Sequence, residues 1–264
     1  ATNGECSDID SVTITYHIPS TPNFTLDNNQ GCTPLTVNFN NTSGPNDFYL
    51  WDFGNGNTTS IDLNPTITYN TPGTYTVILT ITDSICGSTY TKTATVTVAQ
   101  PVSLTIPNNP ITTCDTAYLY ANSTGATTYI WSTTPSFTDT LNTNLQSDSL
   151  TVIVSDTTTY YLFATNGICS NSTSVVVNHI GVIIDVQNGA VCSGQSDTLT
   201  VINLTNQPLS YSWQPVSEII YGETTANPTV NPVTTSTYFV TAQNSLGCST
   251  TDSAIVTVSG TSIN

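Results

Sequence analysis

Seven cysteines carry the most reactive side chains of this 264-residue chain, and their spacing is regular. After Cys6 they fall into three pairs separated by 54, 55 and 56 positions (86 − 32, 169 − 114 and 248 − 192): Cys32 and Cys86, Cys114 and Cys169, Cys192 and Cys248. No cysteine–histidine spacing of the zinc-binding kind accompanies them. The pattern therefore predicts disulfides and an oxidising location outside the cell.

The two histidines, His17 and His179, occupy equivalent points near the ends of repeated segments. We interpret them as features of the repeat near domain junctions. A catalytic histidine would need a nucleophile and a pocket beside it, and the sequence signals neither. The chain also lacks a glycine-rich phosphate loop and a HExxH motif. We therefore expect no enzymatic activity, no catalytic or cofactor-binding residues and no cofactor.

Internal repetition organises these residues. Cys6, Cys86, Cys169 and Cys248 recur at intervals of 80, 83 and 79 positions (86 − 6, 169 − 86 and 248 − 169), and one tryptophan lies inside each cysteine pair: Trp51, Trp131 and Trp213. A fixed period of this length is the signature of tandem domains. It predicts three domains at residues 19–100, 101–181 and 182–264.

Each repeat has the pattern of an all-β domain. Leu35–Phe39 and Tyr75–Ile81 alternate with period two, threonine, valine, isoleucine and tyrosine dominate, and glycine, proline, asparagine and aspartate separate the runs. Short strands, a tryptophan on a middle strand and a tyrosine at a corner are typical of Greek-key β-sandwiches of the immunoglobulin class. We predict an all-β chain of tandem immunoglobulin-like sandwiches.

Residues 1–18 repeat the end of a domain. The Gly-x-Cys turn at Cys6 and the alternating run that follows match the segments that begin at Cys169 and Cys248. We therefore expect residues 1–18 to be the last strand of a preceding immunoglobulin-like domain. Donation of this strand to a neighbouring subunit is the alternative.

The links between the predicted domains are short. Residues 17–22, 99–102 and 178–182 connect them, two of the links contain proline, and none has the glycine–serine composition of a free coil. We expect the tandem domains to form a semi-rigid extended rod.

The charge of the chain is one-sided. Lys92 is the single cation against fourteen aspartates and three glutamates, which gives a net charge of −16. Such a surface repels nucleic acid and anionic lipid, and no apolar run approaches the ~18 residues of a membrane span. We interpret the acidity as a solubilising, self-repelling surface, with weakly bound Ca²⁺ between domains as the alternative.

Residues 19–100 contain four blocks in a fixed order: Gly31–Phe39, Trp51–Gly56, Pro65–Tyr69 and Pro72–Val77. With these blocks the segment resembles a PKD (polycystic kidney disease-type) domain. Asn55 stands where the family signature usually has aspartate. We interpret Asp52 and Asn55 as turn-forming side chains, with a metal site of Asp52, Asn55 and Asn57 as the alternative.

The two later domains look like the immunoglobulin-like repeats of large secreted Bacteroidota surface proteins. Arrays of PKD and such repeats, rich in threonine and asparagine, resemble gliding-motility adhesins exported by type 9 secretion. The resemblance implies a stalk segment of a filamentous cell-surface adhesin whose partners are neighbouring domains of the same chain. The alternative is a polysaccharide-binding accessory array of a secreted hydrolase, with sugars stacking on exposed tyrosines such as Tyr118, Tyr120, Tyr129, Tyr160 and Tyr161.

Eight of the fourteen aspartates open a triplet in which serine or threonine and then a small, aliphatic or threonine residue follow. The triplet is similar to the O-glycosylation signal of Bacteroidota, which implies glycans on Ser11, Ser84, Thr116, Thr140, Ser149, Thr157, Thr198 and Ser253. Aspartate turns that open strands explain some copies without any glycan.

Spacing and strand order favour different disulfides. Spacing suggests nested pairs within each repeat. In an immunoglobulin-like sandwich, however, Cys32 precedes the second strand and Cys86 follows the sixth, which runs in the same direction, so the two lie at opposite ends. Because a disulfide needs Cα atoms about 4.4–6.8 Å apart, strand order favours Cys32–Cys169 and Cys114–Cys248 between consecutive domains. Cys6, Cys86 and Cys192 would then have partners outside this segment.

Overall fold

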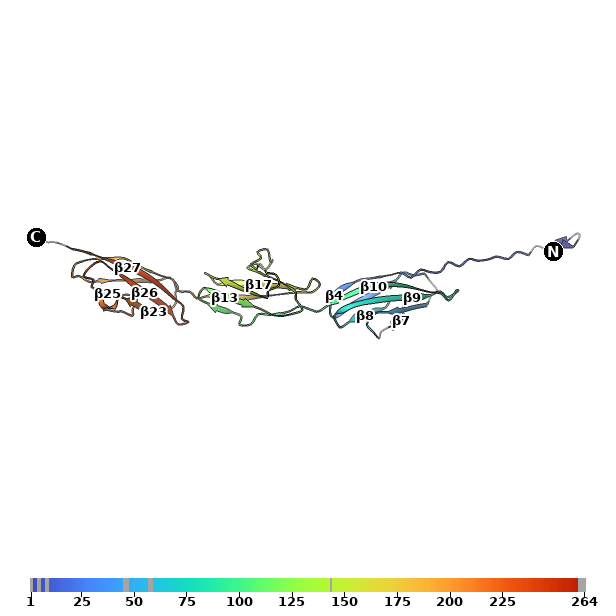
Figure 1. Ribbon diagram of the computed structural model, residues 1–264, viewed down its shortest axis with the longest axis horizontal. Coiled ribbons are helices and arrows are strands. Elements are labelled where there is room, and N and C mark those ends of the chain that lie inside the picture. Colours follow the sequence, from blue (N-terminus) through green and yellow to red (C-terminus); the bar gives the residue numbers. More distant parts are fainter. Residues whose placement is uncertain are drawn as a thin grey trace. The chain divides into compact units, whose positions relative to one another are not determined.

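A computed structural model describes residues 10–44, 48–56, 59–142 and 144–260, together with the backbone of residues 2–3 and 6–7. The described residues form β-strands and one short 3-10 turn, Val216–Glu218. The predicted all-β, immunoglobulin-like fold is confirmed (Figure 1). Contacts divide the chain into a first unit (residues 1–103, 123–128 and 164–171) and a second unit (104–122, 129–163 and 172–264).

The first sandwich consists of a three-stranded and a five-stranded sheet. The smaller sheet has the order β3 (Phe24–Leu26), β5 (Leu35–Asn41), β8 (Thr66–Tyr69). The larger has the order β4 (Gln30–Cys32), β10 (Thr89–Ala99), β9 (Gly73–Thr82), β6 (Phe48–Asp52), β7 (Thr59–Ser60). The two alternating runs that indicate a sandwich, in β5 and β9, thus lie in different sheets.

The core of this sandwich is built by the inward residues of those strands around one tryptophan. Trp51 is fully buried, and its indole N–H donates to the Asp62 carbonyl at 3.0 Å. The Tyr75 hydroxyl donates to the carbonyl of Thr71 at 2.7 Å, which fixes the chain where it enters β9. A buried indole with a satisfied N–H combines a large apolar area with a fixed orientation.

The second repeat contains eight strands in three sheets. They are β12 (Ile111–Thr113), β18 (Ser170–His179), β17 (Thr158–Thr165) and β15 (Thr128–Ser132), then β13 (Thr116–Tyr120) with β16 (Ser149–Ile153), and β11 (Ser103–Thr105) with β14 (Asn122–Thr124). Trp131 is fully buried in its core.

The third repeat has a similar arrangement, with three strands where the second repeat has the pair β13–β16. Its sheets are β20 (Gly189–Cys192), β27 (Ser249–Ser259), β26 (Ser236–Asn244) and β23 (Leu209–Gln214); β21 (Asp197–Thr198), β25 (Thr229–Val230) and β24 (Ile219–Tyr221); and β19 (Ile184–Val186) with β22 (Val201–Asn203). Trp213 is 1 % exposed, and its indole N–H donates to the Thr225 carbonyl at 2.9 Å.

Residues 10–23 have no strand. Within this segment Val12, Ile14, Tyr16 and Ile18 are all more than three quarters exposed. The backbone of residues 2–3 and 6–7 forms two short paired strands, β1 (Thr2–Asn3) and β2 (Cys6–Ser7). The expectation that residues 1–18 complete another domain therefore stays a prediction.

Candidate functional site

Three hairpin turns of common design connect the last two long strands of each repeat. They begin at Asp83 after β9, at Asn166 after β17 and at Asn244, the last residue of β26, and each contains a cysteine. In every turn the first side chain accepts a hydrogen bond from the backbone N–H of that cysteine through Oδ1, at 2.8 Å for Cys86, 2.7 Å for Cys169 and 3.0 Å for Cys248. This local bond sets the direction in which the cysteine leaves the turn.

The glycine of the Gly-Cys motif has a conformational role in two of these turns. Gly167 and Gly247 both have φ +90°, a region that side chains disfavour. The repeated Gly-Cys and Gly-x-Cys sequences therefore mark tight turns that present a cysteine.

The second atom of each turn side chain binds the link that precedes the repeat. Asn166 Nδ2 donates to the Gln100 carbonyl at 2.8 Å and to the Gly125 carbonyl at 2.9 Å. Asn244 Nδ2 donates to the Ile180 carbonyl at 2.8 Å. One amide thus holds its own turn with its oxygen and the preceding link with its nitrogen.

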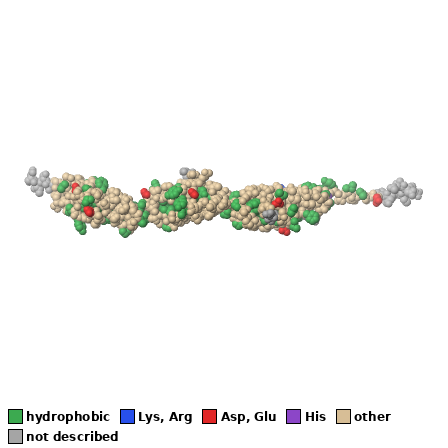
Figure 2. All heavy atoms as spheres, turned by 60° about the horizontal axis from the view of Figure 1, so that its bottom comes forward, with side chains coloured by type: hydrophobic (Ala, Val, Ile, Leu, Met, Phe, Trp, Pro, Cys, Tyr) green, Lys and Arg blue, Asp and Glu red, His purple; other side chains and the backbone are tan. Residues whose placement is uncertain are grey.

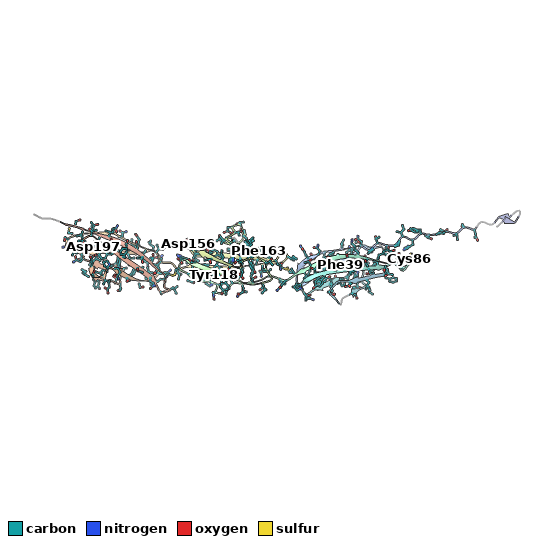
Figure 3. The ribbon with its side chains drawn as sticks, in the orientation of Figure 1. Phe39, Cys86, Tyr118, Asp156, Phe163 and Asp197 are labelled. Carbon is teal, nitrogen blue, oxygen red and sulfur yellow. A yellow bond between two sulfur atoms is a disulfide. The ribbon has the colours of Figure 1, made fainter. Side chains whose placement is uncertain are left out.

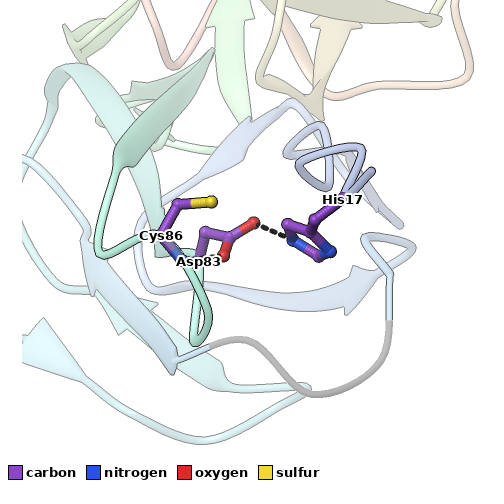
Figure 4. A group of neighbouring side chains, drawn as sticks. All are labelled: His17, Asp83 and Cys86. Carbon is purple, nitrogen blue, oxygen red and sulfur yellow. Dashed lines mark hydrogen bonds and ion pairs between the residues drawn. The ribbon is translucent and has the colours of Figure 1, made fainter. Parts of the chain in front are cut away.

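The first repeat has a carboxylate at this position. Asp83 Oδ2 accepts a hydrogen bond from His17 Nε2 at 2.6 Å, as Figure 4 shows, so a side chain of the preceding segment replaces a backbone carbonyl. A carboxylate has no N–H to offer, which explains why a donor stands opposite it. The Cys86 N–H, followed by the His17 ring, lowers the pKa of the buried Asp83 carboxyl below its usual value.

Sequence reasoning treated Asp83 only as the first residue of a glycosylation triplet and gave no role to Asn166 or Asn244. Their signal is an aspartate or asparagine three or four positions before each turn cysteine. Both residue types accept bonds from a turn backbone two or three positions on.

Two disulfides connect strand ends to turns. Cys32, at the end of β4, is bonded to Cys169 with Cα atoms 5.7 Å apart, and Cys114, directly after β12, is bonded to Cys248 with Cα atoms 5.5 Å apart. These are the two pairs that strand order favours, and the nested pairs suggested by spacing are not formed. Each bond joins one repeat to the turn of the next.

Among the cysteines whose side chains the structure describes, Cys86 and Cys192 are free and exposed. Figure 3 shows Cys86 at the end of the first sandwich. The side chain of Cys6 lies outside the described residues, so its predicted external partner stays a prediction.

His17, Asp83 and Cys86 place one nitrogen, one oxygen and one sulfur within 4.8 Å of one another, a set that could hold a metal ion. Both Asp83 oxygens already accept hydrogen bonds, and the counterparts of Cys86 form disulfides. The arrangement therefore fits a turn more closely than a metal centre.

The Asp52–Asn57 segment forms a turn in its described part. Asp52 Oδ1 accepts the Gly54 N–H at 2.9 Å, and Gly54 has φ +71°. Asn57 lies outside the described residues. The bond supports the turn role of Asp52.

The predicted glycosylation positions lie mostly at the surface. Ser149 is half-buried, and the others are exposed: Ser11, Ser84, Thr116, Thr140, Thr157, Thr198 and Ser253. Some of the preceding aspartates also hold turns, as Asp83 does. Asp139 accepts bonds from the hydroxyls of Ser132, Thr133 and Thr134, and these hydroxyls lower its pKa.

The tyrosines proposed for sugar stacking separate into two classes. Tyr118 and Tyr120, on β13, are exposed and stack with ring centroids 5.9 Å apart. Tyr160 is 5 % exposed and belongs to the core of the second repeat. Figure 3 labels Tyr118 on the second sandwich.

Acidic side chains are scattered singly over the face shown in Figure 2. One open hollow, in the third repeat, has a volume of about 370 Å³ and contains a single carboxylate, Asp197. None of the helical segments in the described part of the chain has the length and apolar character to cross a membrane.

Comparison with known proteins follows the division into repeats. Residues 20–98 match the PKD domain family. The search of curated proteins found no match. A solved structure of the I-band fragment I67–I69 from titin is similar over 92 % of this chain and 100 % of its own, with 13 % identity and a TM-score of 0.54. An E-to-A variant of the same three-domain fragment gives 13 % identity, the same coverage and a TM-score of 0.51. Residues 20–98 are therefore similar to the PKD domain family, and the chain has the fold of tandem immunoglobulin-like domains, which with its disulfides indicates an extracellular protein.

Proposed function

We propose that this chain is a stalk segment of a long filamentous cell-surface adhesin. The stalk presents a distal binding region for surface attachment or gliding, as in the gliding-motility adhesins of Bacteroidota that are exported by type 9 secretion. Neighbouring domains of the same chain are its partners, and it has no catalytic function and no cofactor of its own.

The observation that carries the proposal is the pair of disulfides that connect successive repeats. Cys32–Cys169 and Cys114–Cys248 form covalent bridges across the links at residues 99–102 and 178–182. Asn166 and Asn244 hold the same links by hydrogen bonds. Covalent bridges between domains suit a protein that transmits force along its length.

Charge and surface chemistry support the same function. A net charge of −16 with one lysine opposes collapse of the domains onto each other. The exposed hydroxyls of the aspartate triplets are accessible to glycosylation, which would add a further hydrated layer.

Antibodies against residues 1–264 test this function on intact cells of the source organism. We expect them to label the cell surface, and deletion of the parent gene should remove attachment or gliding. If the antibodies detect the protein only in the culture medium, and a hydrolase activity copurifies with the protein, the proposal is contradicted.

A second candidate function rests on Tyr118 and Tyr120. Their stacked rings are exposed on β13, and flat aromatic faces can pack against sugar rings. In this case the chain would be a polysaccharide-binding accessory array of a secreted hydrolase. A glycan array probed with the whole chain and with Tyr118→Ala/Tyr120→Ala decides it: binding that the double variant loses favours this function, and no binding excludes it.

A further inference from the structure

The two free cysteines are of opposite kinds. Cys86 lies in a hairpin turn, as Cys169 and Cys248 do, and Cys192 lies at a strand end, as Cys32 does. Each disulfide in the structure joins one cysteine of the strand-end kind to one of the turn kind.

The strand-end cysteines share a register. In β4, Cys32 lies opposite Ala99 of β10, and in β20, Cys192 lies opposite Ser259 of β27; both pairings are parallel. Thr113 lies opposite His179 in the parallel pair β12–β18, which puts Cys114 beside the next residue, Ile180. Cys192 is thus placed at the end of its repeat as the two bonded cysteines are placed at theirs.

The Cys86 turn is organised for the same bond. Asp83 orients the Cys86 N–H at 2.8 Å, within the range of the bonded turns, and its second oxygen holds His17 of the preceding segment. His17 stands eleven positions after Cys6, near the same point of its segment as His179, which stands ten positions after Cys169 and directly precedes the carbonyl held by Asn244. The segment before the first repeat is therefore already in the position of a link.

We propose that Cys86 and Cys192 are covalent connection points of a longer series. Cys192 bonds to the turn cysteine of a following domain of this kind, and Cys86 bonds to the strand-end cysteine of a preceding one. The partner in both cases is an immunoglobulin-like domain of the same polypeptide. This inference rests on the proposed stalk function and extends it to the ends of the segment.

The exposed apolar side chains of residues 10–18 indicate what kind of domain precedes. Val12, Ile14 and Tyr16 alternate and are at least 85 % exposed, whereas the alternating Val175 and Val177 of β18 are fully buried. A sandwich that took residues 10–18 as its last strand would bury these side chains. Its strand-end cysteine would then lie beside Ile18, next to the Cys86 turn.

Each bond forms by oxidation of two thiols. Two S–H bonds break, one S–S bond forms, and two protons and two electrons leave. A disulfide-carrying oxidant accepts them: oxidised glutathione is reduced to two glutathione thiols, or an oxidised thiol–disulfide protein is reduced to its dithiol form.

A tandem of two copies tests the connection directly. Joining residue 258 of a complete first copy to His17 of a second retains the partner of Asp83 and places Cys192 and the second Cys86 136 positions apart (66 + 1 + 69). The two observed disulfides have separations of 137 and 134. In a glutathione redox buffer we expect peptide mapping to find the Cys192–Cys86 bond between the copies in most molecules. If both thiols remain free, the proposal is wrong.

Two controls separate a built site from simple proximity. In the first control, Cys86→Ser and Ser84→Cys in the second copy move the thiol by two positions. Bond formation should fall at least about tenfold, because Asp83 Oδ1 orients the backbone N–H of Cys86 and position 84 is exposed without this bond. Mixing separate Cys86→Ser and Cys192→Ser chains at micromolar concentration should form the bond far more slowly, because a short link supplies a millimolar effective concentration. Equal formation in either control would overturn the proposal. Surface labelling of cells plays no part in this assay, so the stalk function and the connection can fail independently.

Discussion

At the residue scale, the side chain that opens each turn connects two structural levels. Asn244 holds Cys248 through its oxygen and the link at Ile180 through its nitrogen, and it is 6 % exposed. A buried polar group is stabilising only when its hydrogen bonds are satisfied. The amide is satisfied only when turn and link are both in place, so it couples the fold of one repeat to the position of its link.

Asp83 makes the first repeat sensitive to acid. Its folded-state pKa is lowered, chiefly by the Cys86 N–H and then by His17, so its contribution to stability is present above its ordinary pKa and is lost as pH falls through the lowered value. Asp83→Asn keeps the acceptor for the turn but cannot be protonated. We expect this variant to be less stable than the parent at pH 7, and its melting temperature to change less between pH 5 and pH 2.

Thermal unfolding followed by tryptophan fluorescence at several pH values measures this difference. Glu223→Gln, at an exposed position of the third repeat, is the control and should follow the parent curve. Parallel pH curves for the Asp83→Asn variant and the parent would contradict the role of Asp83.

Gly54 and Gly56 form a matched pair that tests close packing in the first repeat. Both have positive φ, and alanine in this region costs about 1–2 kcal/mol. A Cβ at Gly54 would lie 2.5 Å from the Thr76 carbonyl oxygen in β9, whereas a Cβ at Gly56 would meet nothing within 4 Å. We expect Gly54→Ala to cost about 1–3 kcal/mol more than Gly56→Ala, as typical overpacking does. Urea unfolding measures both, and equal losses would show that the contact does not matter.

At the scale of elements, an intact hairpin turn should slow the reduction of the disulfide that its cysteine forms. Asn244→Asp replaces the N–H that binds the Ile180 carbonyl by an oxygen, so two acceptors face each other. We expect a loss of about 1–3 kcal/mol, the cost of an unsatisfied buried group. We also expect faster reduction of Cys114–Cys248, because Cys248 is 2 % exposed only while the turn is closed.

The measurement is the rate at which dithiothreitol reduces each disulfide. Asn227→Asp, at an exposed position of the same repeat, is the control. The rate for Cys32–Cys169 should be unchanged in both variants. Equal acceleration of both disulfides would indicate general destabilisation and not loss of the turn.

Elements with strong local patterns could be predicted from the sequence, and those set by a distant partner could not. The alternation in Leu35–Phe39 and Tyr75–Ile81 is confirmed in β5 and β9 because burial of one face imposes period two. The Cys32–Cys169 pair could be reasoned out because strand order fixes which ends meet. The bonds from Asn166 to Gln100 and from Asp83 to His17 could not, since an asparagine in a turn does not reveal its second partner.

At the scale of the whole molecule, the two disulfides interlock along the sequence. The loop closed by Cys32–Cys169 contains Cys114, and the loop closed by Cys114–Cys248 contains Cys169. A pulling force applied to the two ends of the chain therefore passes through the shortest covalent path. That path runs from Cys32 to Cys169, back along the chain to Cys114, and across to Cys248.

This path sets a limit to how far the protein can be stretched. It contains 55 positions (169 − 114), whereas the uncrosslinked chain between Cys32 and Cys248 contains 216 (248 − 32). At about 3.5 Å per extended residue, the maximal separation of Cys32 and Cys248 is about 190 Å with both disulfides and about 750 Å without them. Removing one bond leaves 79 positions (248 − 169, Cys114→Ser) or 82 (114 − 32, Cys32→Ser), so either variant should extend to about 280 Å.

Single-molecule stretching between handles at the two termini reads these lengths directly. The oxidised parent and Cys86→Ser should share the short limit, each single bridge variant should gain about 90 Å, and reduction should release the full length. If the oxidised parent unravelled to the reduced length, the bridges would not bear load and the stalk function would lose its main support. If the short limit holds, the sandwiches can unfold under load while the covalent path stays short, and the exposed chain remains close enough to refold when the force falls.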